Sequence, residues 1–188
     1  MKIEKSEKEA VVLRTILIFA MIVLATALRL APHPWNFTPV GAIALFSGAM
    51  VRDRRMAFLF PLLVMFATDL FIGFNKLSAL VYASFLLSVF IGCFLNQKRN
   101  LLRIGGATFL GALQFFLITN FGVWAFLNSY PRTGAGLAAC YLAGVPLFWN
   151  TLAGDAVYAT LFFGGFFLAE RLAPRLRRSG ISDLQAFP

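Results

Sequence analysis

The sequence has few of the groups that catalysis and metal binding require. Its 188 residues include one histidine, two cysteines and eight acidic residues. His33 has no second histidine with which to share a metal ion, and Cys93 and Cys140 form no CxxC or Cys/His spacing, which argues against a zinc-type site. The sequence also lacks GxSxG, HExxH and Walker motifs. We therefore expect no enzyme, no cofactor and no metal.

Long apolar runs make up most of the sequence. Hydrophobic residues make up 60% of the chain, and its mean hydropathy is +0.78. A helix needs about 20 mostly apolar residues to cross a bilayer, and continuous runs without alternating strands favour helices over a barrel. We predict an all-α membrane protein in which residues 1–188 form one integral membrane domain with about six transmembrane helices. The candidate spans are residues 16–28, 38–51, 56–74, 77–95, 104–124 and 146–168.

Two of these spans are short. The first becomes long enough if it begins near Val11, and we expect the second to extend into its flanks or to tilt. A cleaved signal peptide is an alternative for the first, with Ala25–Thr26–Ala27 as the cleavage site. Its leader carries three glutamates against three lysines, which is not typical of a signal peptide, so we favour a retained span.

The positive charge follows alternate loops. The net charge is +9, and 14 of the 17 Lys and Arg residues fall on one predicted side of the membrane. The positive-inside rule therefore places both termini in the cytoplasm, with tails at 1–12 and 171–188, and predicts a multi-pass protein of the cell inner (plasma) membrane. A nucleic-acid patch would not follow alternate loops, so we expect no nucleic-acid partner. The exceptions, on the outer side, are Arg29, Lys76 and Arg132.

Polar side chains gather in the outer halves of the spans and the outer loops. Asp69 and Asp155 are the only acids deep in a span, and an ionisable group there usually faces a cavity or a partner. Each acid could instead pair with a nearby base and pin helices together. The combination of aromatic and polar groups favours a substrate pocket open to the outside. The candidate substrate-binding residues are His33, Trp35, Asn36, Asp69, Tyr82, Asn120, Trp124, Asn150 and Asp155.

The first outer connection, RLAPHPWNFTPVG at residues 29–41, carries three prolines that end the first span and stiffen the loop. We interpret it as a lid whose His33, Trp35 and Asn36 face the pocket; His33 as a solvent-facing loop residue is the alternative. The longest outer connection, 125–145, contains an apolar stretch from Leu137 to Val145. This stretch is too short to span, and it predicts a re-entrant or interfacial helix over the same face.

Small residues recur in two spans, at Gly41, Ala44, Gly48 and Ala49 and again at Gly105, Gly106, Gly111 and Ala112. Such patterns let helix backbones approach closely. We interpret them mainly as packing positions within the bundle, with docking of another membrane protein as the alternative.

The motifs PHPWNFTPVGAIALFSGA, TDLFIGF, TNFGVW and FWNTLAGDAVY resemble an uncharacterised bacterial family of predicted transport proteins, over about residues 28–163. More loosely, the chain is similar to the substrate-binding S-components of energy-coupling-factor (ECF) vitamin transporters. That resemblance implies an S-component-like bundle of six spans with a pocket capped by the outer loops. It implies uptake of a small nutrient such as a vitamin or cofactor, cobalamin among the candidates. It also implies a separate energising transmembrane and ATPase module as a partner.

Two functions from different classes follow. The first is a membrane transport protein, the substrate-binding and uptake component for a small molecule. The second is a structural or assembly protein of the bilayer that binds no ligand. A cavity of several hundred Å³, the usual order for small-molecule sites, would favour the first function. An outer half filled by side chains would favour the second.

Overall fold

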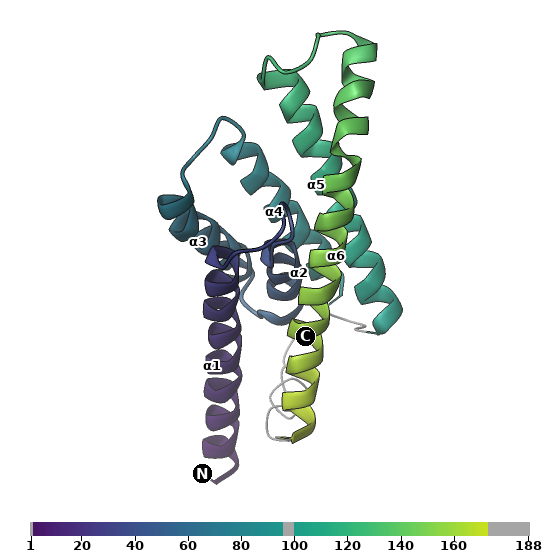
Figure 1. Ribbon diagram of the computed structural model, residues 1–188. Helices are drawn as coiled ribbons and strands as arrows, with labels where there is room; N and C mark the ends of the chain where they lie inside the picture. Colours follow the sequence, from purple (N-terminus) through teal and green to yellow (C-terminus); the bar gives the residue numbers. More distant parts are fainter. Residues whose placement is uncertain (1, 96–99, 173–188) are drawn as a thin grey trace.

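The computed structural model describes residues 2–95 and 100–172, and this part of the chain contains helices and no strand. Lys98, Arg99 and the predicted C-terminal tail beyond residue 172 lie outside the described residues. The predicted all-α fold class is confirmed. The six helices (Figure 1) are α1 (Lys2–Leu30), α2 (Val40–Met50), α3 (Arg54–Ile72), α4 (Ser78–Cys93), α5 (Leu101–Phe126) and α6 (Gly134–Leu172).

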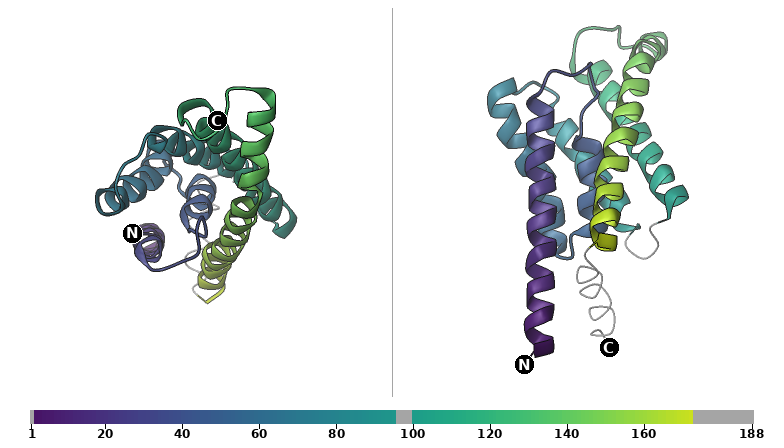
Figure 2. Two further views of the ribbon diagram at one scale, coloured as in Figure 1. Left: turned by 45° about the horizontal axis from the view of Figure 1, so that its top comes forward. Right: turned by 60° about the horizontal axis from the view of Figure 1, so that its bottom comes forward.

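Successive helices run in alternating directions, so the start of α1 and the end of α6 lie toward the same end of the bundle (Figures 1 and 2). The connections at 31–39, 73–77 and 127–133 lie at the opposite end, which we call the outer end after the predicted orientation. Three helices, α3, α5 and α6, are long and apolar enough to span a membrane. The apolar parts of the other three are shorter, and a count of six spans remains a prediction.

Helix α2 differs from the expected second span. It has 11 residues, all of them buried, and at about 1.5 Å per residue it is only about half as long as the hydrocarbon core is thick. It does not extend into its flanks, because Pro39 precedes it and the next helix starts soon after. Asp53 caps that helix by accepting hydrogen bonds from the backbone N–H groups of Arg55 and Met56. Helix α2 is therefore a short buried helix at the centre of the bundle.

Glycines let α2 and α4 meet backbone to backbone. A Cβ atom at Gly48 would overlap the carbonyl oxygen of Val89, and one at Gly92 would overlap the carbonyl oxygen of Leu45. The predicted packing role of small residues therefore holds at Gly48. It does not hold at Gly105 and Gly106, where an added Cβ would meet no atom of the described residues within 4 Å.

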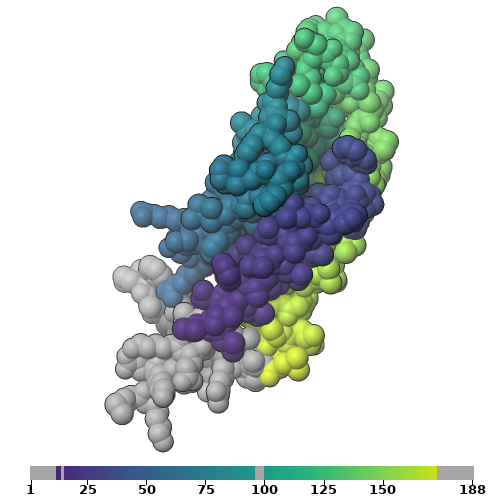
Figure 3. Space-filling view, turned by 60° about the vertical axis from the view of Figure 1, so that its left-hand side comes forward, coloured from purple at the N-terminus to yellow at the C-terminus, as the bar shows by residue number. Residues whose placement is uncertain are grey.

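Helix α6 is continuous over 39 residues, or about 58 Å at the α-helical rise. The expected separate helix at 137–145 is therefore wrong, because this stretch forms the first part of α6. Helix α6 changes direction partway along its length (Figure 2), and Pro146, which lacks the N–H of a regular turn, lies inside it. The outer ends of α5 and α6 project beyond the other helices (Figure 3).

The aromatic core lies toward the inner end, between α2 and α6. Phe46 is fully buried, and its ring contacts those of Phe162, Phe163 and Phe166 at centroid distances of 5.3 to 6.0 Å. Two of the three contacts are edge-to-face, the arrangement that the charge distribution of aromatic rings favours. This packing fixes α6 against α2.

Candidate functional site

A cavity of about 180 Å³ lies where the six helices converge. Its lining includes residues from every helix and from the α1–α2 connection, so no single hairpin forms it. Apolar side chains make up much of the wall, and a few polar groups interrupt them. The lining residues are Arg29, Asn36, Thr38, Val40, Gly41, Met65, Val81, Phe85, Ser88, Gly111, Phe115, Thr151 and Asp155.

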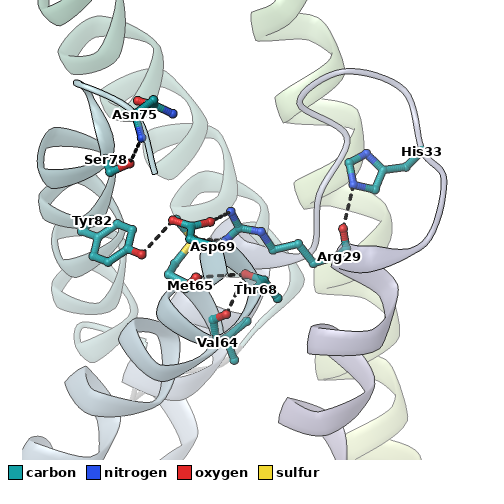
Figure 4. A network of polar contacts seen from close by, with 9 residues as sticks. All are labelled: Arg29, His33, Val64, Met65, Thr68, Asp69, Asn75, Ser78 and Tyr82. Carbon is teal, nitrogen blue, oxygen red and sulfur yellow. Dashed lines mark hydrogen bonds and ion pairs between the residues drawn. The ribbon is translucent and has the colours of Figure 1, made fainter. Parts of the chain in front are cut away.

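One side of the cavity is bounded by a polar network that joins α1, α3 and α4 (Figure 4). Arg29 donates from Nη2 to Oδ1 of Asp69 at 2.7 Å, and the Tyr82 hydroxyl donates to Oδ2 of the same carboxylate at 2.7 Å. The other guanidinium nitrogen of Arg29, Nη1, contacts the sulfur of Met65. Asp69 is buried, with 5% of its surface exposed, so its charge is neutralised by Arg29 and not by water.

His33 supports this network from the end of α1. Nε2 of its ring lies 3.1 Å from the backbone oxygen of Arg29 (Figure 4). Nδ1 lies 2.9 Å from the backbone oxygen of Pro34. The carbonyls of a helix C-terminus have no partner within the helix, and a side chain can supply one. His33 thus holds the chain where α1 turns into the outer connection.

The opposite wall of the cavity carries a second acid. Asp155 is 3% exposed, and among the described residues it makes no ion pair. Ala42, in the first turn of α2, directs its backbone N–H toward this carboxylate. The carboxylate lies directly against Gly41, where an added Cβ would overlap it. Asp155 therefore lies at the N-terminal turn of α2, where unpaired N–H groups favour negative charge.

The α1–α2 connection closes over this acid through a tight turn. Phe37 N–H donates to the carbonyl of Pro34 at 3.0 Å, and Asn36, the third residue of the turn, has φ 61°. Type II turns require a positive φ at this position, which Gly and Asn tolerate. The Asn36 side chain lines the cavity.

Helix α6 holds the connection in place. Asn150 donates from Nδ2 to the backbone carbonyl of Trp35 at 3.1 Å. One turn later, an added Cβ at Gly154 would lie 3.1 Å from the Cα of Phe37 and 3.2 Å from the N of Thr38. These distances are close for a Cβ, so glycine permits the approach of the loop backbone to α6.

The wall formed by α4 and α5 is aromatic, with one unsatisfied polar atom nearby. The rings of Phe85 and Phe115 stack with centroids 5.1 Å apart. Behind them, Gln114 donates from Nε2 to Ser84 O, Ser88 Oγ and Gly111 O. These acceptors fix the orientation of the amide and leave its Oε1 buried without a partner in the described part of the chain.

The structure places the nine predicted site residues in different positions relative to the cavity. Asn36 and Asp155 line the cavity, and Asp69 and Tyr82 adjoin it through Arg29. His33 and Asn150 hold the connection and do not line the cavity. Trp35 differs most from its expected role: it is 84% exposed, because the turn directs its side chain away from the cavity.

Asn120 and Trp124 lie elsewhere, between the projecting ends of α5 and α6. Asn120 donates to Phe116 O, and its side chain lies against Gly144. Trp124 donates to Pro131 O at 2.9 Å, and its ring lies 5.8 Å below the guanidinium carbon of Arg132. Both residues stabilise the α5–α6 hairpin, so the expected single pocket containing all nine residues is not formed.

Sequence reasoning missed several lining residues. The sequence identifies Arg29 only as a basic residue of the outer side, and it does not single out Thr38, Ser88 or Thr151. A signal was available for Thr151, because it precedes Asp155 by four residues and must share its helix face. For Arg29 the signal was its position at the end of an apolar run, one turn before the PHPWNF motif.

The chain belongs to a family of unknown function (DUF6580), whose family model matches residues 9–176. Comparison with curated proteins and with solved structures yields no match.

Proposed function

We propose that this member of the DUF6580 family is a multi-pass membrane protein that binds a small solute in the cavity at the convergence of its helices. The observation that supports this proposal is the position of Arg29 and Asp155, two ionisable residues on the wall of one cavity to which all six helices contribute. Ionisable groups at such depth are costly and mark substrate or ion pathways in membrane proteins. A bundle needing only mechanical strength would fill this space with apolar side chains.

The cavity volume limits the size of the solute. Small-molecule sites usually measure about 300–1,000 Å³, whereas an apolar cavity of about 150 Å³ accepts benzene. The 180 Å³ found here therefore suits a molecule of about six to eight non-hydrogen atoms in this conformation. A vitamin, and cobalamin above all, would require a wider conformation. The proposal is accordingly for a small nutrient or a fragment-sized metabolite.

The position of the cavity favours capture from the outer side. Its lining includes Asn36 and Thr38 of the first outer connection and the first turn of α2, which lie toward the outer end. With both termini cytoplasmic, as the charge distribution predicts, the protein would act as an uptake component of the inner (plasma) membrane. The resemblance to S-components adds a separate energising module to this proposal.

One observation favours the structural alternative. The network of Arg29, Asp69 and Tyr82 satisfies its own charges and ties three helices together, as a purely structural ion pair would. This reading accounts for Asp69. It leaves Asp155 on the cavity wall without a cation among the described residues, so solute binding explains more of the site.

The proposal is tested by identifying small molecules that co-purify with the detergent-extracted protein, using mass spectrometry. A matched pair of variants makes the result specific. Gly111→Leu places a large side chain at the cavity wall, whereas Gly105→Leu makes the same change on the same helix where an added Cβ meets nothing. We expect a bound solute in the wild type and in Gly105→Leu, and its loss from Gly111→Leu. Empty protein in all three, with no stabilisation by any solute of a broad panel, would favour the structural alternative.

A further inference from the structure

We propose that the solute is a small organic cation, whose ammonium group pairs with Asp155 and whose apolar body lies against Phe85 and Phe115. This inference rests on the proposed function and assigns its substrate class. It follows from the charge, the polar atoms and the apolar wall of the same cavity.

The charge of the cavity favours a cation. Two ionisable side chains line it, Arg29 and Asp155, and Arg29 is already paired with Asp69 at 2.7 Å. That pair is neutral overall, so Asp155 is left as an acidic side chain with no cationic partner among the described lining residues. A buried carboxylate is stable only when it is paired, hydrogen-bonded or protonated, and a solute with one positive charge would complete the site.

Oxygen atoms around Asp155 fit an ammonium group, which offers only hydrogen-bond donors. Thr151 lies one turn before Asp155 on the same face of α6, and Asn36 and Thr38 approach from the connection. The Thr151 hydroxyl donates to Leu147 O at 2.9 Å, so its oxygen lone pairs remain available to accept. Three side chains with acceptor oxygens thus accompany the carboxylate on this wall.

The remaining wall suits a carbon skeleton better than a bare metal ion. Val40, Met65 and Val81 line the cavity together with the stacked rings of Phe85 and Phe115. Aromatic faces attract organic ammonium groups, and apolar contacts gain from burying their carbon atoms. The described residues contain no cluster of three His, Cys, Asp or Glu that could hold a metal ion. A cavity of 180 Å³ is also far larger than one alkali-metal ion needs.

The test compares two probes of the same shape on the purified full-length protein. Cyclohexylammonium and cyclohexanol each have seven non-hydrogen atoms, and only the first is charged. Isothermal titration calorimetry in detergent measures both affinities, with sodium and potassium chloride as separate arms. A charge-assisted hydrogen bond contributes about 1.5–3 kcal/mol, so we expect the amine to bind about ten- to a hundredfold more tightly than the alcohol.

Asp155→Asn removes the charge at nearly constant shape, and Asp53→Asn is the matched control. Asp53 caps α3 away from the cavity, and asparagine caps helices as well as aspartate does. We expect Asp155→Asn to abolish the preference for the amine and Asp53→Asn to retain it. If Asp155→Asn does not fold, the comparison of the two probes on the wild-type protein still tests whether the cavity prefers a cation.

Three outcomes would overturn the inference. Equal binding of amine and alcohol would show that the cavity does not distinguish a charged solute from a neutral one, and the proposed solute binding would stand. Binding of an alkali-metal ion without the amine would assign Asp155 to an inorganic ion. Binding of no probe and no other solute would remove the proposed function together with the inference.

Discussion

Arg29 and Asp69, 40 residues apart in the sequence, form an ion pair with Nη2 and Oδ1 separated by 2.7 Å. Their side chains are only 12% and 7% exposed. The pair joins the outer end of α1 to α3, and Tyr82 extends it to α4. Helix α1 otherwise presents many apolar side chains to the outside, including Ile16, Phe19 and Val23, so this pair is its main polar anchor in the described bundle.

Removing one member of the pair should destabilise the protein. Arg29→Gln or Asp69→Asn leaves the other charge buried and unpaired, and such changes cost about 3–5 kcal/mol. We expect a clear fall in the thermal unfolding midpoint in detergent, and a double variant less destabilised than the sum of the two single variants. Lys76→Gln, at an exposed position, serves as a control and should change stability by less than about 0.5 kcal/mol. Additive losses would mean that the pair contributes no coupling.

Tyr82→Phe removes only the hydroxyl that donates to Asp69 Oδ2. A hydrogen bond to a charged group contributes about 1.5–3 kcal/mol, so this variant should lose less stability than Arg29→Gln. Thermal unfolding in the same detergent gives the comparison. A loss as large as that of Arg29→Gln would indicate that Tyr82 contributes as much as Arg29 to stabilising the carboxylate.

Gly48→Ala should separate α2 from α4. The added Cβ overlaps the backbone oxygen of Val89, which cannot move without displacing its helix. Overpacking of this kind costs about 1–3 kcal/mol. Gly105→Ala is the control, since its Cβ meets nothing and alanine favours a helix over glycine by about 0.5–1 kcal/mol. The two variants should therefore shift the unfolding midpoint in opposite directions; a shift in the same direction would contradict the close approach of these helices.

Trp35 and Asn36, expected from the sequence to act together, should behave differently. Asn36→Gly keeps the positive φ of the turn and removes the side chain that lines the cavity. We expect it to weaken solute binding by about 1–3 kcal/mol. Trp35→Ala removes a side chain that is 84% exposed and should leave the affinity unchanged. Titration of the co-purified solute, once identified, measures both; weakened binding in Trp35→Ala would restore the lid hypothesis.

The predicted orientation can be checked with reporter fusions. Fusions at Arg54 and Arg99 should report a cytoplasmic location, and those at Asn36 and Arg132 an external one, because basic residues concentrate on the first side. Alkaline phosphatase and a fluorescent protein that folds only in the cytoplasm give opposite signals at each site. Inverted signals at two of the four positions would reverse the side from which the cavity is filled.

The helices could be predicted from the sequence because the length of an apolar run is a local property. The predicted spans 56–74 and 104–124 nearly coincide with α3 and α5. The burial of α2 could not be predicted in this way, since an apolar segment looks the same whether lipid or protein surrounds it. The continuity of α6 through Pro146 was missed because proline usually ends a helix.

The candidate site was predictable in part, for a related reason. Depth in a span identified Asp69 and Asp155 as unusual, because an acid there needs a partner. The depth of an acid does not predict which residue pairs with it. For Asp69 the partner depends on how α1 packs on α3. The direction of the Trp35 side chain could not be predicted from the sequence either. It depends on the tight turn at residues 34–37, and the composition of the loop does not specify which way that turn faces.

The brevity of α2 has a consequence for the biogenesis of the protein. An 11-residue segment cannot rest stably across a bilayer by itself, and its end groups would face hydrocarbon until other helices surround it. Its surroundings include α4, α5 and α6, which emerge from the ribosome later. We therefore expect α2 to stay at the insertion machinery or the membrane surface during synthesis. It can pack at the centre of the bundle only after most of the chain has been made.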